Sequence, residues 1–162
     1  MLEPSFNALA LPTRKATKHL ARSLARAVLP GDALILTGGL GAGKTFLVRA
    51  LCRALGLSEQ VRVVSPTFTL VRELDTRPPI AHADLYRLAT PEEAFQLGLL
   101  ELRERGYVLL VEWGERCPEA LGADRLVVTL ETGPRRARFT ATGPRSEALR
   151  AELIAGSTES PS

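Results

Sequence analysis

The strongest constraint on the fold is a glycine-rich run at residues 38–45, which has the spacing G-x-x-x-x-G-K-(S/T). An apolar stretch at 33–36 precedes the run and predicts a buried strand. The stretch 46–55 follows with helical periodicity and ends at Gly56. A strand, a glycine-rich loop and a helix in this order are the setting in which such a run binds phosphate. We therefore predict a phosphate-binding loop rather than a glycine-rich turn with an incidental lysine.

Each residue type in this loop has a chemical reason to be there. Glycines let the backbone curl so that successive N–H groups face phosphate oxygens, and the helix N-terminus adds a positive dipole end. Lys44 is placed to reach the β- and γ-phosphates, and the Thr45 hydroxyl to coordinate Mg²⁺. The residues predicted to hold the nucleotide are those of the loop and the first helical turn: Gly38, Gly41, Ala42, Gly43, Lys44, Thr45 and Phe46.

Length and composition indicate one globular domain. The chain has 162 residues, of which 45% are hydrophobic, and we expect residues 1–155 to form a single P-loop domain and 156–162 a disordered tail. We expect neither a signal peptide nor a membrane-spanning run. Cys52 and Cys117 lack metal-ligand spacing, which favours reduced thiols in a cytoplasmic protein.

The net charge of +3 is too small to indicate a nucleic-acid-binding protein, but its distribution is uneven. Residues 1–63 carry nine Lys and Arg against three Asp and Glu, whereas 64–162 carry twelve against fifteen. A basic first half suits a polyanionic nucleotide. A solvated basic helix explains most of this charge, with these residues: Arg14, Lys15, Lys18, Arg22 and Arg26.

Apolar periodicity and turn residues predict the remaining elements. Strands are predicted at 61–64, 68–74, 80–86 and 107–111, and a hairpin at 125–131 and 135–142. Helices are predicted from Thr13, from Pro91, and at 99–105 and 146–154.

Three polar side chains in the second half are candidates for the chemistry. Glu112 follows the apolar strand 107–111, where a carboxylate can serve a metal or a water beside the loop; an exposed loop glutamate is the alternative. Asp84 ends another strand, and an active-site role and an ion pair with Arg87 are equally open. Thr67 resembles the hydroxyls that sense Mg²⁺ and γ-phosphate in switch segments, with a turn threonine as the alternative.

Other residues are less specific. His82 by itself predicts a packed, hydrogen-bonded histidine, and Trp113 is as consistent with a core or surface anchor as with ligand contact. Asn7 is the only asparagine, so the chain contains no N-K-x-D motif that reads guanine. ATP is therefore favoured over GTP.

Together these motifs resemble those of the bacterial TsaE (YjeE) family, and the resemblance spans residues 14–142. The matching stretches are Gly38 to Thr45, Ser65-Pro66-Thr67-Phe68-Thr69-Leu70, His82-x-Asp84-x-Tyr86-Arg87 and Glu112-Trp113. The resemblance implies a P-loop NTPase-like, three-layer α/β/α fold with a central, mostly parallel sheet and helices on both faces.

The resemblance also implies a function: slow, Mg²⁺-dependent ATP hydrolysis by a subunit of tRNA threonylcarbamoyladenosine biosynthesis. The implied partners are TsaD and TsaB, which the subunit resets between turnovers. Apart from the resemblance, the basic N-terminal helix allows weak or indirect contact to tRNA, and we expect no contact with membranes. By motif match, Lys44 holds phosphates, Thr45 and Glu112 serve the metal, and Thr67 lies in a switch-like segment. Asp84 is implied to be needed for activity.

Two rivals to this interpretation stay open. A small-molecule kinase would use Asp84 as its base and Arg135, Arg136 and Arg138 as lid arginines, although their spacing is more typical of an exposed hairpin strand. A nucleotide-sensing module would regulate a partner without turnover. The chain also departs from the family at Phe46, where a second Thr is common, so Thr45 alone supplies the hydroxyl.

Overall fold

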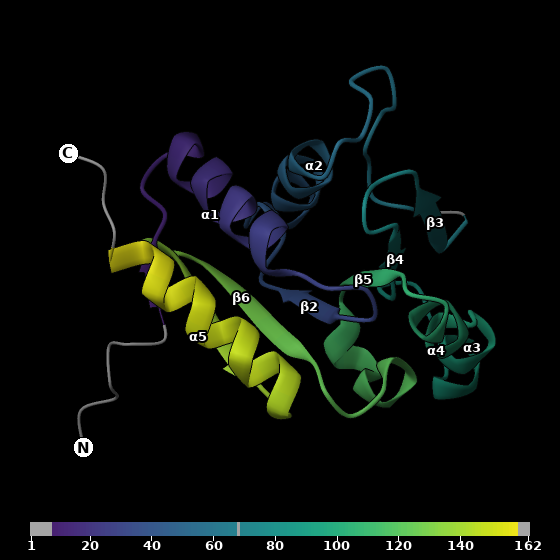
Figure 1. The fold of residues 1–162 in the computed structure, drawn as a ribbon. Helices are drawn as coiled ribbons and strands as arrows, with labels where there is room; N and C mark the ends of the chain where they lie inside the picture. Colours follow the sequence, from purple (N-terminus) through teal and green to yellow (C-terminus); the bar gives the residue numbers. More distant parts are fainter. Residues whose placement is uncertain (1–7, 68, 159–162) are drawn as a thin grey trace.

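The computed structural model describes residues 8–67 and 69–158, and in these residues one sheet has the strand order β1-β7-β6-β2-β5-β4-β3 (Figure 1). The four central strands, β6, β2, β5 and β4, run parallel to one another. The edges are antiparallel, because β1 and β7 extend one side and β3 the other. The strands are β1 (Ala8–Ala10), β2 (Ala33–Thr37), β3 (Val71–Leu74), β4 (Ile80–Asp84), β5 (Val108–Glu112), β6 (Leu126–Thr132) and β7 (Arg135–Ala141).

Helices cover both faces of the sheet, as Figure 1 shows. Alternation along β2 separates the two cores: Leu34 and Leu36 pack with the first group of helices, and Ile35 with the second. The first group is α1 (Arg14–Ala27), α2 (Lys44–Ala54) and α5 (Pro144–Thr158). The second group is α3 (Pro91–Gln96), α4 (Leu99–Glu104) and the 3₁₀ turns η2 (Gly114–Arg116) and η3 (Pro118–Leu121). This is the three-layer, P-loop NTPase-like fold that the resemblance implied.

Helix starts follow the capping chemistry of the sequence. The Thr13 hydroxyl accepts a hydrogen bond from the amide of Ala16 at 3.1 Å and so caps α1. Thr90 caps α3 in the same way, and Pro91 occupies its first turn. The predicted starts of these two helices are confirmed.

The strand predicted at 61–64 is wrong, because this segment is irregular. Side chains bond three of its carbonyl groups in place of a neighbouring backbone: two bonds come from α2, and Arg72 of β3 donates to the carbonyl of Arg62. Arg53 donates to the carbonyl of Val61 at 2.6 Å, and Arg49 to that of Val63 at 3.4 Å. Long guanidinium groups can therefore replace a ladder of backbone hydrogen bonds, which apolar content alone does not reveal.

Several predicted bounds also differ from the structure. Strand β3 begins later than residue 68, which itself lies outside the described residues, and β4 ends at Asp84, because its carboxylate accepts the Tyr86 amide at 2.9 Å and turns the chain. Helix α5 continues to Thr158, so 156–158 are helical instead of disordered, and 159–162 lie outside the described residues. Strand β1 was not predicted. Among the helices described, none combines the length and apolarity that crossing a bilayer requires.

Candidate active site

The glycine-rich loop curls between the end of β2 and the start of α2. Gly38, Gly41 and Gly43 have φ angles of 145°, 77° and 103°, which disfavour residues with a Cβ. At Gly38 a Cβ atom would also stand 2.6 Å from the carbonyl oxygen of Leu130. Helix α2 begins at Lys44, and its N-cap residue Gly43 provides no side-chain hydrogen bond. Its first-turn N–H groups are therefore left for an anion.

Lys44 lies over this loop and is only 7% exposed. Its Nζ atom donates to the carbonyl oxygens of Gly38 at 2.5 Å and Gly39 at 3.2 Å. The same atom sits 4.4 Å from the ring centroid of Trp113. The ammonium group is thus held at the loop by two carbonyls and one aromatic face.

Glu112 is the carboxylate nearest to the start of α2, and it is buried. The hydroxyl of Thr45 donates to its Oε1 atom at 3.1 Å, and Nε2 of His82 lies 2.6 Å from its Oε2 atom. His82 is buried as well. The structure therefore brings together the two predicted metal-serving residues and adds a histidine that the sequence analysis treated only as a packed residue.

The register of the strands explains why Glu112, His82 and the loop lie close together. Glu112 is paired with Leu36 of β2 on one side and with Asp84 of β4 on the other. The carboxyl ends of three parallel strands thus meet where the loop leaves β2. His82 lies two residues before Asp84 on the same face of β4, and that period-2 spacing is the signal that could have indicated it.

Asp84 is hydrogen-bonded to the segment between α2 and β3. Its Oδ2 atom accepts from the Ser65 hydroxyl at 2.5 Å. Thr67 is exposed, and its hydroxyl donates to the Ser65 carbonyl at 3.2 Å. Asp84 is therefore a neighbour of Glu112 in the sheet, but its described side-chain hydrogen bond goes to Ser65, whose carbonyl accepts from Thr67, whereas Glu112 is bonded to Thr45. The sequence analysis did not single out Ser65 as a site residue.

An aromatic wall stands beside Lys44. Trp113 has a φ angle of 59°, and its ring centroid lies 5.0 Å from that of Tyr86. The guanidinium of Arg116 lies 5.1 Å from the Tyr86 ring. Of these residues, only Trp113 touches Lys44.

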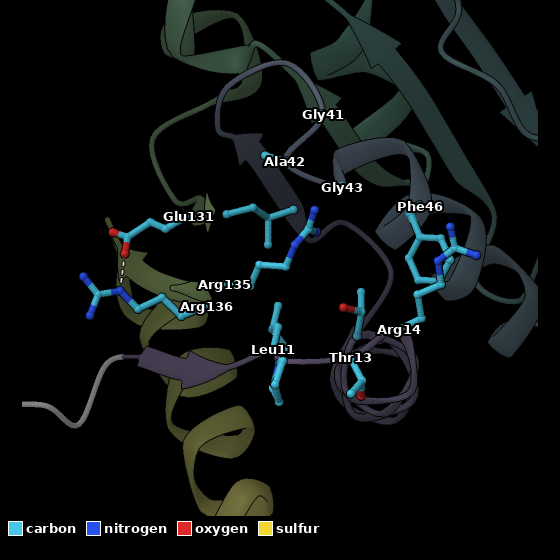
Figure 2. Close-up of a pocket in the computed structure, with 13 residues that line it drawn as sticks. Leu11, Thr13, Arg14, Gly41, Ala42, Gly43, Phe46, Glu131, Arg135 and Arg136 are labelled. Atoms are coloured by element: carbon cyan, nitrogen blue, oxygen red, sulfur yellow. Dashed lines mark hydrogen bonds and ion pairs between the residues drawn. The ribbon is translucent and has the colours of Figure 1, made fainter. Parts of the chain in front are cut away.

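A cavity of about 340 Å³ opens on the other side of the loop (Figure 2). Its lining comes from the loop, from Phe46, from the start of α1 and from the β6–β7 hairpin. Arg135 points toward the loop in Figure 2, whereas Arg136 turns away to Glu131. That hydrogen bond lowers the pKa of Glu131. Arg138 also donates a hydrogen bond to Glu131. Arg136 and Arg138, two of the three arginines of the kinase alternative, are therefore both bound to this carboxylate.

Comparison with known proteins decides the family. Residues 11–139 match the sequence model of a family described as "Threonylcarbamoyl adenosine biosynthesis protein TsaE". The chain belongs to the TsaE family. It is 39% identical over 141 residues to the tRNA threonylcarbamoyladenosine biosynthesis protein TsaE of Bacillus subtilis. This alignment covers 85% of this chain and 87% of the Bacillus protein. The TsaE of Rickettsia felis is 40% identical over 124 residues, 76% of this chain and 71% of the relative.

A solved structure agrees with this TsaE assignment. The crystal structure of Bacillus subtilis YdiB superposes with a TM-score of 0.77 and 32% sequence identity. The match covers 93% of this chain and 95% of that one. The resemblance stated from the motifs is confirmed, and the fold is that of the neighbour.

The residues of this TsaE chain fit a magnesium nucleotide. The loop offers backbone N–H groups and an ammonium group for phosphates, and Thr45 and Glu112 offer a hydroxyl and a carboxylate, the hard oxygen ligands that Mg²⁺ prefers. Within residues 8–67 and 69–158, no three His, Cys, Asp or Glu side chains are placed to enclose a metal ion.

Proposed function

We propose that this chain binds ATP with Mg²⁺ and hydrolyses it slowly as a subunit of tRNA threonylcarbamoyladenosine biosynthesis. In this proposal it acts in the cytoplasm with TsaD and TsaB and resets their complex between turnovers, and residues 1–155 work as one P-loop domain. The single observation that carries the chemistry is the 3.1 Å hydrogen bond from Thr45 at the start of α2 to Glu112 at the end of β5. Membership of the TsaE family supports the role in tRNA threonylcarbamoyladenosine biosynthesis.

Each group then has a defined task. The loop amides and Lys44 bind the β- and γ-phosphates, and bound Mg²⁺ supplies charge neutralisation there. The Thr45 hydroxyl and the Glu112 carboxylate are the groups that would hold Mg²⁺, and Glu112 would also orient the attacking water. Thr67 belongs to the switch-like segment, and Asp84 at the end of β4 is needed for activity because the Ser65 hydroxyl donates to its carboxylate and would transmit a movement of this segment to β4.

The cavity beside the loop supplies the remaining part of a nucleotide site. It adjoins Gly43 and Phe46, so a nucleotide with its phosphates in the loop has its ribose and base there. The Arg14 guanidinium lies 5.9 Å from the Phe46 ring centroid and closes one side. The absence of a guanine-reading motif leaves ATP as the nucleotide of the proposal.

The test measures phosphate release and nucleotide binding in parallel. Lys44→Ala should lower both turnover and ATP affinity, with turnover falling about 100-fold, because it removes the ammonium group that is bonded to the loop. Glu112→Gln should abolish turnover while retaining binding. Glu115→Gln is the matched control, because that glutamate is exposed in η2.

Three outcomes would contradict the proposal. Unchanged turnover in both Lys44→Ala and Glu112→Gln would remove the assigned chemistry. A phosphorylated acceptor instead of free phosphate would identify a small-molecule kinase. A single turnover without further release, even with TsaD and TsaB present, would identify a nucleotide-sensing module.

A further inference from the structure

A second hollow of about 730 Å³ lies between α1 and α2, which run beside each other on one face of the sheet (Figure 1). We call it the α1–α2 groove. Side chains from the two helices form its walls, with one further residue from the loop after α2. The lining residues are Lys18, Arg22, Ala25, Arg26, Phe46, Arg49, Ala50, Arg53, Ala54 and Glu59.

The cations of the groove form two rows. Lys18, Arg22 and Arg26 recur every four residues along α1 and therefore share one helix face. Their row is about 12 Å long at 1.5 Å per residue. Arg49 and Arg53 form the facing row on α2, and neither helix contains an Asp or a Glu. Like charges at this spacing repel one another, so folding alone gives no reason for the arrangement.

No carboxylate neutralises these rows. Within the described part of the chain, none of the five cations forms an ion pair, although Glu59 lines one end of the groove. Arg49 and Arg53 use part of their donors on backbone carbonyls of the irregular segment. The α1 cations are exposed, and Arg26 reaches only the Ser23 hydroxyl at 3.5 Å. The positive charge of the groove is therefore open to a ligand.

The floor of the groove distinguishes between kinds of polyanion. Ala25, Ala50 and Ala54 are small, and Phe46 is the only large apolar side chain in the lining. A protein partner is usually held by several large apolar or aromatic anchors at the centre of the contact, and Phe46 by itself does not make such a cluster. Arginines outnumber lysines in it, and guanidinium groups bind phosphate oxygens in pairs. The lining thus favours a phosphodiester backbone over an acidic protein.

We propose that the α1–α2 groove binds the phosphate backbone of RNA. The choice of a tRNA as the probe rests on the proposed function in tRNA modification. The shape and the charge of the groove are independent of that function. Phe46 lines both this groove and the nucleotide cavity, so the RNA backbone lies directly beside the ATP site. Phe46 then borders both ligands, while the ATP and the RNA occupy separate sites.

The test is fluorescence anisotropy of a labelled, folded tRNA transcript with the full chain between about 50 and 200 mM salt. Arg22→Gln/Arg26→Gln removes two groove charges, and Gln keeps the helix propensity of α1. Arg77→Gln/Arg105→Gln removes two exposed charges elsewhere and is the matched control. The groove variant should bind about tenfold more weakly, and its log–log salt slope should be shallower by about 1.5, from two lost phosphate contacts. The control should stay within about twofold.

Equal weakening of both variants would overturn the proposal, since general charge would then explain binding. Absence of binding by the unaltered chain at 50 mM salt would overturn it too. Unchanged tRNA binding with lost capture of TsaD and TsaB would assign the groove to an acidic protein. Lys18→Gln/Arg22→Gln should repeat the effect if the first variant folds poorly. ATP turnover in the same samples separates the two hypotheses, because failed turnover by the unaltered chain contradicts the proposed function and leaves the RNA result standing.

Discussion

Nε2 of His82 lies 2.6 Å from Oε2 of Glu112, and these two buried side chains are 1% and 3% exposed. The other carboxylate oxygen accepts the Thr45 hydroxyl. Glu112 is thus held from both sides before any ligand enters, which is how a buried carboxylate avoids an unpaired oxygen. His82 acts on the site through its hydrogen bond to Glu112, and we regard it as a positioning residue for that carboxylate.

Replacing His82 should show this role. His82→Ala leaves one Glu112 oxygen unpaired, so we expect a loss of about 1–3 kcal/mol in the free energy of unfolding and a lower kcat with little change in KM for ATP. Urea unfolding and steady-state kinetics measure the two effects. His19→Ala is the matched control, because His19 is exposed on α1. A changed KM with an unchanged kcat would contradict the positioning role.

The role of the Thr45 hydroxyl can be tested separately from the volume of the Thr45 side chain. Thr45→Val keeps the β-branched volume and removes the oxygen, so the Mg²⁺ concentration for half-maximal turnover should rise about tenfold. Thr45→Ser restores a hydroxyl and should restore the magnesium dependence. The measurement is turnover against Mg²⁺ at saturating ATP. If the valine and serine variants behave alike, Thr45 does not serve the metal.

Asp124 fastens the start of α5, since its carboxylate accepts the amides of Arg145 at 2.8 Å and Ser146 at 2.9 Å. Burial opposes ionisation of this group, but the hydrogen bonds from Ser146 and Arg145 outweigh it and lower the pKa of Asp124. Its stabilisation is therefore complete above the unfolded-state value of about 3.9 and disappears as the pH falls through the folded-state pKa. Asp124→Ala should lose about 1–2 kcal/mol at pH 7.

Urea unfolding between pH 7 and pH 2 measures that prediction. The free energy of unfolding of the unaltered chain should decrease more on acidification than that of Asp124→Ala. Asp75→Ala removes an exposed carboxylate and should leave the pH dependence unchanged. Parallel curves for Asp124→Ala and the unaltered chain would show that the carboxylate contributes nothing through its ionisation.

Cys52 should be unreactive while the protein is folded. It is buried in α2, and burial raises the pKa of its thiol to about 12, despite the opposing charge of Arg53. The reactive thiolate is therefore scarce at pH 8. In a Cys117→Ser variant, which leaves Cys52 as the only thiol, labelling by a disulfide reagent should be slow in buffer and rapid in urea. Rapid labelling of the folded variant would contradict the burial of α2.

Parts of the site could be predicted because their signals are local. The loop needs glycines at positive φ, and Gly43 shows this directly. The apolar run before Glu112 predicted β5, which the structure confirms. The contact between His82 and Glu112 had no such signal, since it depends on the register of two strands that are far apart in sequence. Ser65 was missed for the same reason.

The failures of the element prediction have a related cause. Residues 61–64 are apolar enough for a strand, but arginines of α2 donate hydrogen bonds to the carbonyls of Val61 and Val63. Strand β1 is only three residues long and exists because β7 offers it an edge. Neither fact can be read from a window of neighbouring residues, because hydrogen-bond partners from elsewhere in the chain decide both.

The sequence by itself determined the glycine-rich loop, the strand and helix that flank it, and the resemblance to the TsaE family. These depend on backbone freedom, capping and apolar periodicity, which act over a few residues. Only the tertiary structure decided that Thr45 and Glu112, 67 residues apart, lie within 3.1 Å of each other. It also decided that β6 adds beside β2 and that two rows of cations face one groove. Those arrangements arise from burial and strand pairing between distant segments, for which no local pattern exists.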